Sequence, residues 1–220
     1  MLAIYTKYYN LDDHTRDILK HLGTPLEYGP GEMIYYQDEP ASGLVYLDEG
    51  KIKNFFLYSD GTEKTLCILE APSITGETAV IDGGTSICCA VAVTQVKIVF
   101  IPREKAQELL ASKPELMMLI LKYMALKIRS MQVQAQEIVS NIPQRLAYLL
   151  LNYKKYGIFV HNAQDPRLFI KHDELAGFIG TTRPKVTEHL NNFSRKGLID
   201  KGRGYIVIKD LEGLRKISRH

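Results

Sequence analysis

The sequence contains no tryptophan and only three cysteines among its 220 residues. Cys67, Cys88 and Cys89 match neither the spacing of a disulfide framework nor that of a zinc site, so both are excluded as the basis of the fold. Cys88 and Cys89 are neighbours on an expected strand, where their side chains would point to opposite faces. We therefore expect buried, inert thiols, with a redox or effector role as the alternative.

Long apolar runs are also absent. No segment reaches the roughly 18 consecutive apolar residues that a membrane span needs. The first residues, MLAIYTKYYNLDDHTRD, do not combine a basic start with an apolar core, so they predict no signal peptide. We expect a cytoplasmic protein with no membrane partner.

The sequence shows none of the usual patterns of an enzyme. It has no carboxylate pair in a glycine-framed loop, no nucleophile elbow and no metal-ligand cluster. Glu77 could by itself mimic a general base, but its setting favours binding a ligand hydroxyl or a backbone amide, or capping its loop. We therefore predict a protein that is not an enzyme, and we identify no cofactor or metal site.

Basic residues are concentrated at the C-terminal end. From Arg183 onward there are ten Lys and Arg against four Asp and Glu, whereas residues 1–182 hold eighteen against twenty-one. The hydrophobic content of 45% and the charged content of 24% are ordinary for a globular protein, so disorder is not expected. A basic end on a mildly acidic body indicates a polyanionic partner for that end.

The first half of the chain begins with a segment of helical periodicity and continues with short segments typical of strands. Residues 11–22 have apolar positions at helical spacing, whereas residues 24–102 run in short segments rich in Val, Ile, Tyr and Phe. Turn sequences such as DEG at 48–50 and DGG at 82–84 separate these segments, which is typical of an antiparallel β-barrel or roll. The sequence therefore predicts an α+β protein with an N-terminal antiparallel β-roll.

A short helix at 103–112 and a long helix at 113–140 are expected next. In the long helix one set of apolar residues recurs at alternating spacings of four and three, which predicts a coiled-coil seam and a homodimer. The seam consists of Met117, Leu121, Met124, Ile128, Met131, Ala135 and Ile138. A second stripe would pack on the β-roll, because two stripes need two surfaces. That stripe consists of Leu116, Leu119, Ile120, Tyr123 and Leu126. A buried helix without a dimer is the alternative.

The segment from Asn141 onward predicts a winged helix-turn-helix. Asn141 can cap a first helix. HDELAGFIG at 172–180 indicates a short helix ended by Gly180, and a recognition helix follows at 182–196. GLIDKGRGYIVIKD at 197–210 predicts two short strands around a basic turn, a wing suited to phosphate contacts. A helical packing domain without nucleic acid is the alternative.

The exposed face of the recognition helix and the wing carry the expected DNA contacts. Arg183 can bind guanine bidentately, and Glu188 can accept from cytosine N4 or repel wrong sites. Cations opposite phosphates release counterions and favour association, although the same cations could only keep the surface soluble. The predicted DNA-binding residues are Thr182, Arg183, Pro184, Lys185, Thr187, Glu188, Asn191, Lys201 and Arg203.

The order of β-roll, long helix and winged helix-turn-helix resembles the cyclic-AMP receptor / fumarate–nitrate regulator (Crp–Fnr) family of bacterial transcription regulators. The resemblance covers about residues 23–209, and its strongest parts are GEMIYYQDEPASGLVYLDEGKIKNFF, SDGTEKTLCIL, TGE and ELAGFIGTTRPKVTEHLNNFSRKGLI. It implies a cyclic-nucleotide-binding-like jelly roll and an effector pocket between this roll and the long helix. It also implies that effector binding reorients two recognition helices on a palindromic operator. The segment KYMALKIRSMQ is loosely similar to the halogenated-phenol-sensing regulators.

By this resemblance, residues of the roll and of the long helix would hold the effector. They are Leu66, Cys67, Leu69, Gly76, Glu77, Thr78, Ser86, Ile87, Lys127, Ile128 and Met131. GETAVIDGGTSICCAVA at 76–92 keeps the glycine-framed loop of the family, but Ser86 and Ile87 stand where the cyclic-nucleotide branch has an Arg-Ser pair. Met131 and Gln132 stand where that branch has an adenine-contacting Thr-Ser.

These departures change which effectors are expected. A buried phosphate without a bidentate arginine is poorly paired, and Lys127 is a weak point-charge substitute. The iron–sulfur branch needs an N-terminal cysteine cluster, and the first cysteine here is Cys67. On the recognition helix, the family's Glu and Arg contacts fall at Pro184 and Glu188, and only Arg183 keeps its family type. We therefore expect an operator that differs from the best-known family palindrome.

The sequence thus predicts a homodimeric, sequence-specific DNA-binding transcription regulator controlled by a small-molecule effector other than cyclic AMP. Its expected partners are double-stranded DNA, a second copy of the chain and RNA polymerase. The alternative keeps the DNA binding and makes the sensor domain constitutive or responsive to cysteine oxidation. The expected domains are the effector-sensing roll at 1–112, the dimerisation helix at 113–140 and the DNA-binding domain at 141–220.

Overall fold

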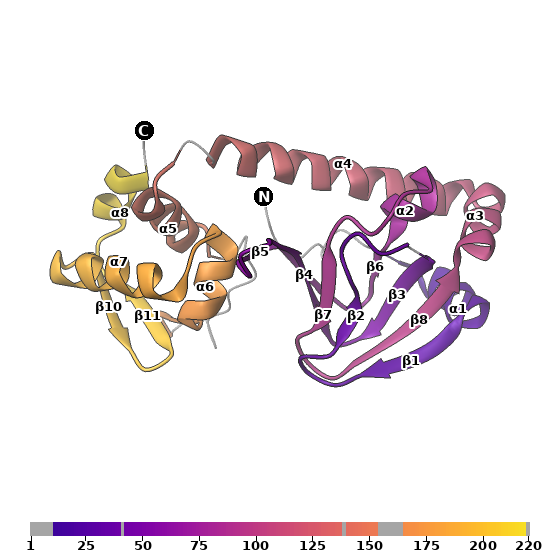
Figure 1. The fold of residues 1–220 in the computed structure, drawn as a ribbon, viewed down its shortest axis with the longest axis horizontal. Coiled ribbons are helices and arrows are strands. Elements are labelled where there is room, and N and C mark those ends of the chain that lie inside the picture. Colours follow the sequence, from indigo (N-terminus) through magenta and orange to yellow (C-terminus); the bar gives the residue numbers. More distant parts are fainter. Residues whose placement is uncertain (1–10, 41, 138–139, 154–164, 219–220) are drawn as a thin grey trace. The chain divides into compact units, whose positions relative to one another are not determined.

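The computed structural model describes residues 11–40, 42–137, 140–153 and 165–218 (Figure 1). The chain forms two compact units. Of the described residues, the first unit contains those up to Leu57 together with Leu66–Arg129, and the second contains Tyr58–Thr65 together with those from Ser130 onward. The division at Arg129 falls inside the long helix, so the predicted domain limits at 112 and 140 remain predictions.

The first unit is a β-roll of two antiparallel four-stranded sheets. One sheet has the strand order β1-β8-β3-β6 and the other β2-β7-β4-β5. The strands are β1 (Thr24–Tyr28), β2 (Met33–Tyr35), β3 (Gly43–Glu49), β4 (Lys51–Leu57), β5 (Glu63–Glu70), β6 (Ser73–Thr75), β7 (Cys89–Ala92) and β8 (Val96–Pro102). Along β5 buried and half-buried residues alternate, which is the pattern of a strand with one face on a core.

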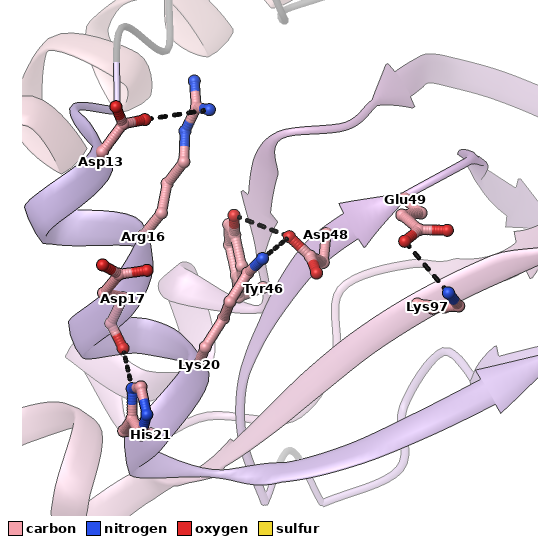
Figure 2. Close-up of polar contacts among 9 residues, drawn as sticks. All are labelled: Asp13, Arg16, Asp17, Lys20, His21, Tyr46, Asp48, Glu49 and Lys97. Atoms are coloured by element: carbon pink, nitrogen blue, oxygen red, sulfur yellow. Dashed lines mark hydrogen bonds and ion pairs between the residues drawn. The ribbon is translucent and has the colours of Figure 1, made fainter.

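Four helices accompany the roll. They are α1 (Asp13–Leu22), α2 (Glu77–Asp82), α3 (Arg103–Ser112) and α4 (Pro114–Glu137). Polar contacts tie α1 to β3 (Figure 2): Lys20 Nζ lies 2.8 Å from Asp48 Oδ1, and the Tyr46 hydroxyl donates to the same oxygen at 3.2 Å. Burial, with the charge of Asp48, raises the pKa of Tyr46 to about 12, so this hydroxyl stays a donor at neutral pH.

The N-terminal half of α4 packs on the core of the roll. Leu116, Ile120 and Tyr123 are buried at 4%, 0% and 2% exposure, in one cluster with residues such as Leu44 and Ile98. Leu119 is half-buried and packs against the same cluster. The predicted roll-facing stripe is therefore confirmed at these four positions. Its fifth member, Leu126, lies outside the side chains that the structure describes.

The second unit contains α5 (Ile142–Leu151), β9 (Arg167–Phe169), α6 (His172–Ile179), α7 (Arg183–Arg195), β10 (Ile199–Gly202), β11 (Tyr205–Ile208) and α8 (Leu211–Ser218). The predicted cap of α5 is confirmed: the Asn141 side chain accepts from the Gln144 backbone at 3.1 Å, and the Gln144 side chain accepts from the Asn141 backbone at 2.8 Å. Three strands form one antiparallel sheet in the order β10-β11-β9.

The predicted α+β class, with an antiparallel roll, a long helix and a winged helix-turn-helix, is confirmed (Figure 1). Among the helices of the described ranges, none is long and apolar enough to cross a bilayer.

Candidate nucleic-acid interface and effector site

The helices α6 and α7 form the predicted helix-turn-helix. Gly180 between them adopts a φ of 64°, in the left-handed region where a side chain would strain the backbone. Thr182 is at the N-cap position of α7, although its side chain makes no capping hydrogen bond. The buried face of α7 consists of Val186, Leu190 and Phe193. Packing of this face leaves the opposite face of α7 exposed.

That exposed face carries a shallow depression with a volume of about 580 Å³. The depression is lined by five predicted DNA contacts, namely Arg183, Pro184, Thr187, Glu188 and Asn191. Of the other four, Thr182, Lys185 and Arg203 are exposed and Lys201 is half-buried on β10. The structure thus brings five of the nine predicted residues together in one hollow of the recognition helix.

Two residues at the start of α6 contact this face, and the sequence analysis missed both. Asp173 Oδ1 lies 3.7 Å from Arg183 Nε, with both side chains 67% exposed, so the pair contributes little stability. His172 Nδ1 lies 2.8 Å from Thr187 Oγ1. Burial and the charges of Lys201 and Arg183 lower the pKa of His172. The sequence carries no signal for these contacts, because they depend on how α6 crosses α7.

At the base of the wing an arginine lies near two aromatic rings. Arg167 Cζ lies 5.3 Å from the centre of the Phe169 ring and 5.6 Å from that of Tyr205. Its Nη2 also lies 2.8 Å from Asp165 Oδ2. Because Phe169 is on β9 and Tyr205 is on β11, this cluster joins the two strands beside the basic hairpin.

In the roll, the central feature of the predicted effector site is an ion pair. Glu77 begins α2 and is fully buried, and its Oε1 lies 2.5 Å from the Nζ of Lys127 on α4. The Lys127 side chain is 24% exposed, and its Nζ lies 4.6 Å from the centre of the Tyr123 ring. Burial lowers the pKa of Lys127, but the charge and hydrogen bond of Glu77, together with the neighbouring Cys67 and Cys88, outweigh burial and the pKa is raised. Lys127 is therefore a cation already neutralised by the protein.

The second carboxylate oxygen of Glu77 has no hydrogen-bond partner within the described part of the chain. A buried acceptor of this kind is costly unless a ligand or water donates to it. Gly76 before it adopts a φ of 83°, and a Cβ there would lie 2.8 Å from the Gly43 carbonyl oxygen. This close approach explains the glycine and fixes where Glu77 enters the roll.

The loop after α2 is held by an arginine from α3. Arg103 donates to the carbonyl oxygens of Gly83 and Gly84, at 3.4 and 3.2 Å. The Asp82 side chain accepts from the Gly84 backbone at 2.8 Å. At the position of the missing clamp, Ser86 is half-buried and Ile87 is 47% exposed. The loop keeps its shape through its own contacts and presents no cation at these two positions.

The structure places the predicted effector residues in different settings. Cys67 and Leu69 are buried on one face of β5, whereas Leu66 is half-buried on the other, because successive strand residues face opposite ways. Leu66 therefore cannot line the same wall as the other two. Ile128 is 55% exposed, so within one chain it does not enclose the site. Gly76 and Thr78 lie beside Glu77 as expected, and the side chain of Met131 is outside the described set.

All three cysteines are free and buried, as predicted. Burial raises the pKa of Cys67 to about 12 and that of Cys88 to about 11. Cys89 Sγ accepts a hydrogen bond from the Gln37 backbone at 3.4 Å. Since the reactive form of cysteine is the thiolate, the thiols of Cys67 and Cys88 are poorly suited to redox sensing.

Two family models match the chain. A cyclic nucleotide-binding domain matches residues 25–113, and a Crp-like helix-turn-helix domain matches residues 144–217. The two matches cover the β-roll and the winged helix-turn-helix in the order that the structure shows. The chain belongs to the Crp–Fnr family.

Relatives within the Crp–Fnr family are transcription regulators. The cyclic AMP receptor protein of Thermus thermophilus is 26% identical over 192 residues, which cover 87% of this chain and 86% of the relative. The global nitrogen regulator of Nostoc is 28% identical over 170 residues, which cover 76% of each chain. The solved structure of the c-di-GMP responsive global regulator CLP of Xanthomonas campestris has a TM-score of 0.79 at 20% identity, and covers 90% of this chain and 99% of that one.

The names of these relatives point to different effectors. One protein is named for cyclic AMP and another is described as responsive to c-di-GMP. Overall similarity to Crp–Fnr proteins at this level therefore does not identify the effector of this chain.

A double-mutant cycle tests the Glu77–Lys127 pair. Lys127→Met leaves a buried carboxylate without a cation, and we expect it to lower the free energy of unfolding by about 2–4 kcal/mol, because breaking a buried pair costs more than removing it. Adding Glu77→Gln to this variant should recover about half of the loss or more. The measurement is urea unfolding followed by circular dichroism, since the chain has no tryptophan.

Lys122→Met is the matched control, because Lys122 is an exposed lysine of the same helix. It should change the unfolding free energy by no more than about 0.5 kcal/mol. Equal effects of the two single lysine variants would contradict the assigned role of Lys127.

Proposed function

We propose that this protein is a homodimeric, sequence-specific transcription regulator whose DNA binding is controlled by a small-molecule effector other than cyclic AMP. The effector would bind in the β-roll against α4, and two copies of α7 would read a palindromic operator. RNA polymerase is the further partner that such regulation implies. The observation that carries the proposal is the depression on the exposed face of α7, which gathers base-reading side chains.

The chemistry of that face supports recognition of specific bases. An arginine can donate two hydrogen bonds to guanine, an asparagine can pair with adenine and a glutamate can accept from cytosine. Arg183, Asn191 and Glu188 supply these three groups within one hollow. Lys201 and Arg203 on the neighbouring wing supply cations for phosphates, which fix register without reading sequence.

The effector site supports an uncharged ligand. An incoming phosphate would either take Lys127 from Glu77 and leave a buried carboxylate unpaired, or be buried beside a cation that is already neutralised. Each alternative costs several kcal/mol. The second oxygen of Glu77 is an acceptor, so a neutral molecule with a hydroxyl or N–H donor fits the site better than an anion.

The ion pair also favours one form of the alternative function. Lys127 and Glu77 neutralise each other within the chain, so the roll can hold α4 through its own side chains, and a constitutive sensor domain is the second candidate. Control by cysteine oxidation has less support, because burial raises the pKa of both Cys67 and Cys88.

Exposed apolar residues on α4 support the homodimer. Met118, Leu121 and Ile128 are 53%, 49% and 55% exposed, and Ala125 between them is exposed too. These four follow the three-four spacing of a coiled-coil seam. From the predicted seam, Leu121 and Ile128 lie on this outer face, whereas Met117 and Met124 are half-buried and pack on the core of the roll. The other members, Met131, Ala135 and Ile138, lie outside the described side chains.

Selection from a random-sequence duplex library tests the DNA binding. The full-length protein should enrich a palindrome, and Arg183→Ala should weaken binding to it about 5- to 100-fold, since one bidentate base contact contributes about 1–3 kcal/mol of discrimination. Lys201→Ala should instead reduce the slope of log Kd against log salt concentration by about the amount that one phosphate contact contributes. Fluorescence anisotropy measures both, with Arg215→Ala on α8 as a control for the loss of one charge. Site discrimination that survives Arg183→Ala would contradict the base contact.

Calorimetric titration tests the effector class. Wild-type protein should not bind cyclic AMP with micromolar affinity, because the anion clamp is missing. The double variant Ser86→Arg with Ile87→Ser restores the Arg-Ser pair and should bind cyclic AMP more tightly than the wild type.

A thermal-shift screen of uncharged phenols and other hydroxylated molecules should find a stabiliser, since a ligand at about a hundred times its Kd adds about 2.7 kcal/mol. Micromolar binding of cyclic AMP to the wild type would overturn the proposed class, and a screen without hits favours the constitutive alternative.

Sedimentation equilibrium tests the homodimer. At micromolar concentration the wild type should sediment at twice the chain mass of 25.0 kDa. Leu121→Glu with Ile128→Glu puts charges into the seam and should give a monomer. Lys122→Glu, which changes an exposed charge on the same helix, should remain dimeric. A monomeric wild type would refute the dimer.

A further inference from the structure

His172 and Thr187 form a hydrogen-bond chain that determines how each of them is protonated. The Thr187 hydroxyl has a single hydrogen, which it donates to the Arg183 carbonyl oxygen at 3.0 Å. The same oxygen lies 2.8 Å from His172 Nδ1. Both contacts are satisfied together only when Nδ1 carries a hydrogen and donates to Thr187. The neutral ring then keeps its hydrogen on Nδ1, and Nε2 is the atom that can take up a proton.

The charges around His172 come from three elements. Lys201 on β10 and Arg183 on α7 lower the pKa of His172 in addition to burial, and Asp173 on its own helix partly opposes them. The helix α5, which also packs on α6, adds no charge that shifts this pKa among the described residues. A proton on Nε2 is therefore disfavoured mainly by burial and by two cations that belong to the predicted DNA-binding surface.

We propose that His172 is a positioning residue of the DNA-binding surface, which orients Thr187 through Nδ1 and takes up a proton at Nε2 when the phosphates of a duplex reach Arg183 and Lys201. The proton comes from hydronium in the solvent: an O–H bond of hydronium breaks, the Nε2–H bond forms, and water is left. Phosphates neutralise the two cations that oppose a charged imidazole, so the imidazolium is tolerated in the complex. This inference rests on the proposed DNA binding and adds a proton to that reaction.

The direction of the pH dependence follows from linkage. In the free protein the pKa of His172 lies below its ordinary value of 6.5, and in the complex it rises. The complex then binds more protons than the free protein, so DNA affinity increases as the pH falls through the window between the two pKa values. Above both values His172 is neutral in both states and contributes nothing. A rise of about one pKa unit corresponds to about a tenfold gain in affinity.

The test compares pH profiles of variants of the full-length protein. His172→Asn keeps a side-chain N–H near the position of Nδ1 but cannot titrate. Binding to the selected palindrome and to a random duplex of the same length is measured by anisotropy at constant ionic strength, from about pH 7.5 to about pH 5.5. We expect wild-type affinity to rise about 3- to 10-fold more than that of His172→Asn over this range. His189→Asn removes a histidine that lies on α7 instead of α6, and this variant should keep the wild-type profile.

A direct measurement covers the case in which His172→Asn fails to fold. Nuclear magnetic resonance of histidine-labelled wild type, with the His172 signal assigned through the His172→Asn and His189→Asn spectra or by sequential assignment, should show a higher His172 pKa with the palindrome bound than without it. Equal pKa values in the two states, or a wild-type pH profile in His172→Asn, would overturn the inference and leave the DNA binding intact. A wild type that binds neither duplex at any pH would overturn both.

Discussion

A buried carboxylate is costly unless a cation or a donor compensates it, and in the β-roll the ion pair between Glu77 and Lys127 provides this compensation. Glu77 is placed at the start of α2 by a left-handed turn at Gly76, and its partner Lys127 comes from α4. The pair therefore ties a loop of the roll to the helix that also carries the exposed apolar face. Because an unpaired charge at this depth costs several kcal/mol, a ligand that donates to Glu77 acts on the environment of α4 as well.

This ion pair changes what the absence of an arginine at Ser86 and Ile87 implies for ligand binding. In a site without any cation, an arginine lost from the loop would leave only an apolar pocket. Here Lys127 is present, but its charge is used by Glu77, and Arg103 is used by the carbonyl oxygens of the loop. The roll thus keeps the frame of a cyclic-nucleotide-binding domain, while the charges around Glu77 are those on which the proposal of a neutral ligand rests. A family model named for cyclic nucleotides describes the frame, and the side chains decide what it holds.

In the DNA-binding unit, contacts between α6 and α7 likewise connect residues of the exposed surface. Thr187 lies in the hollow of the recognition helix and is held between the Arg183 carbonyl and the ring of His172. Asp173 reaches the guanidinium of Arg183 from the same helix as His172. The first helix of the motif therefore does more than pack against the second, because its first two residues contact Arg183 and Thr187 on the exposed face.

Much of this architecture is predictable from local patterns, because each of them depends on residues close together in the chain. The cap at Asn141, the turn at Gly180 and the roll-facing stripe of α4 follow from helix capping, glycine geometry and helical spacing. The recognition helix was placed to within one residue at each end. Strand alternation, which is also a local pattern, places Leu66 on the face of β5 opposite Cys67, and its assignment to the effector set stays a prediction.

The sequence by itself determined the order of the elements, the basic end and the absence of an arginine at Ser86 and Ile87. Only the tertiary structure decided that Lys127 pairs with Glu77, that Met117 and Met124 face the core, and that His172 reaches Thr187. The physical reason is the same in each case. These contacts join different elements of the chain, and their geometry is set by packing angles between helices and strands that no local spacing encodes.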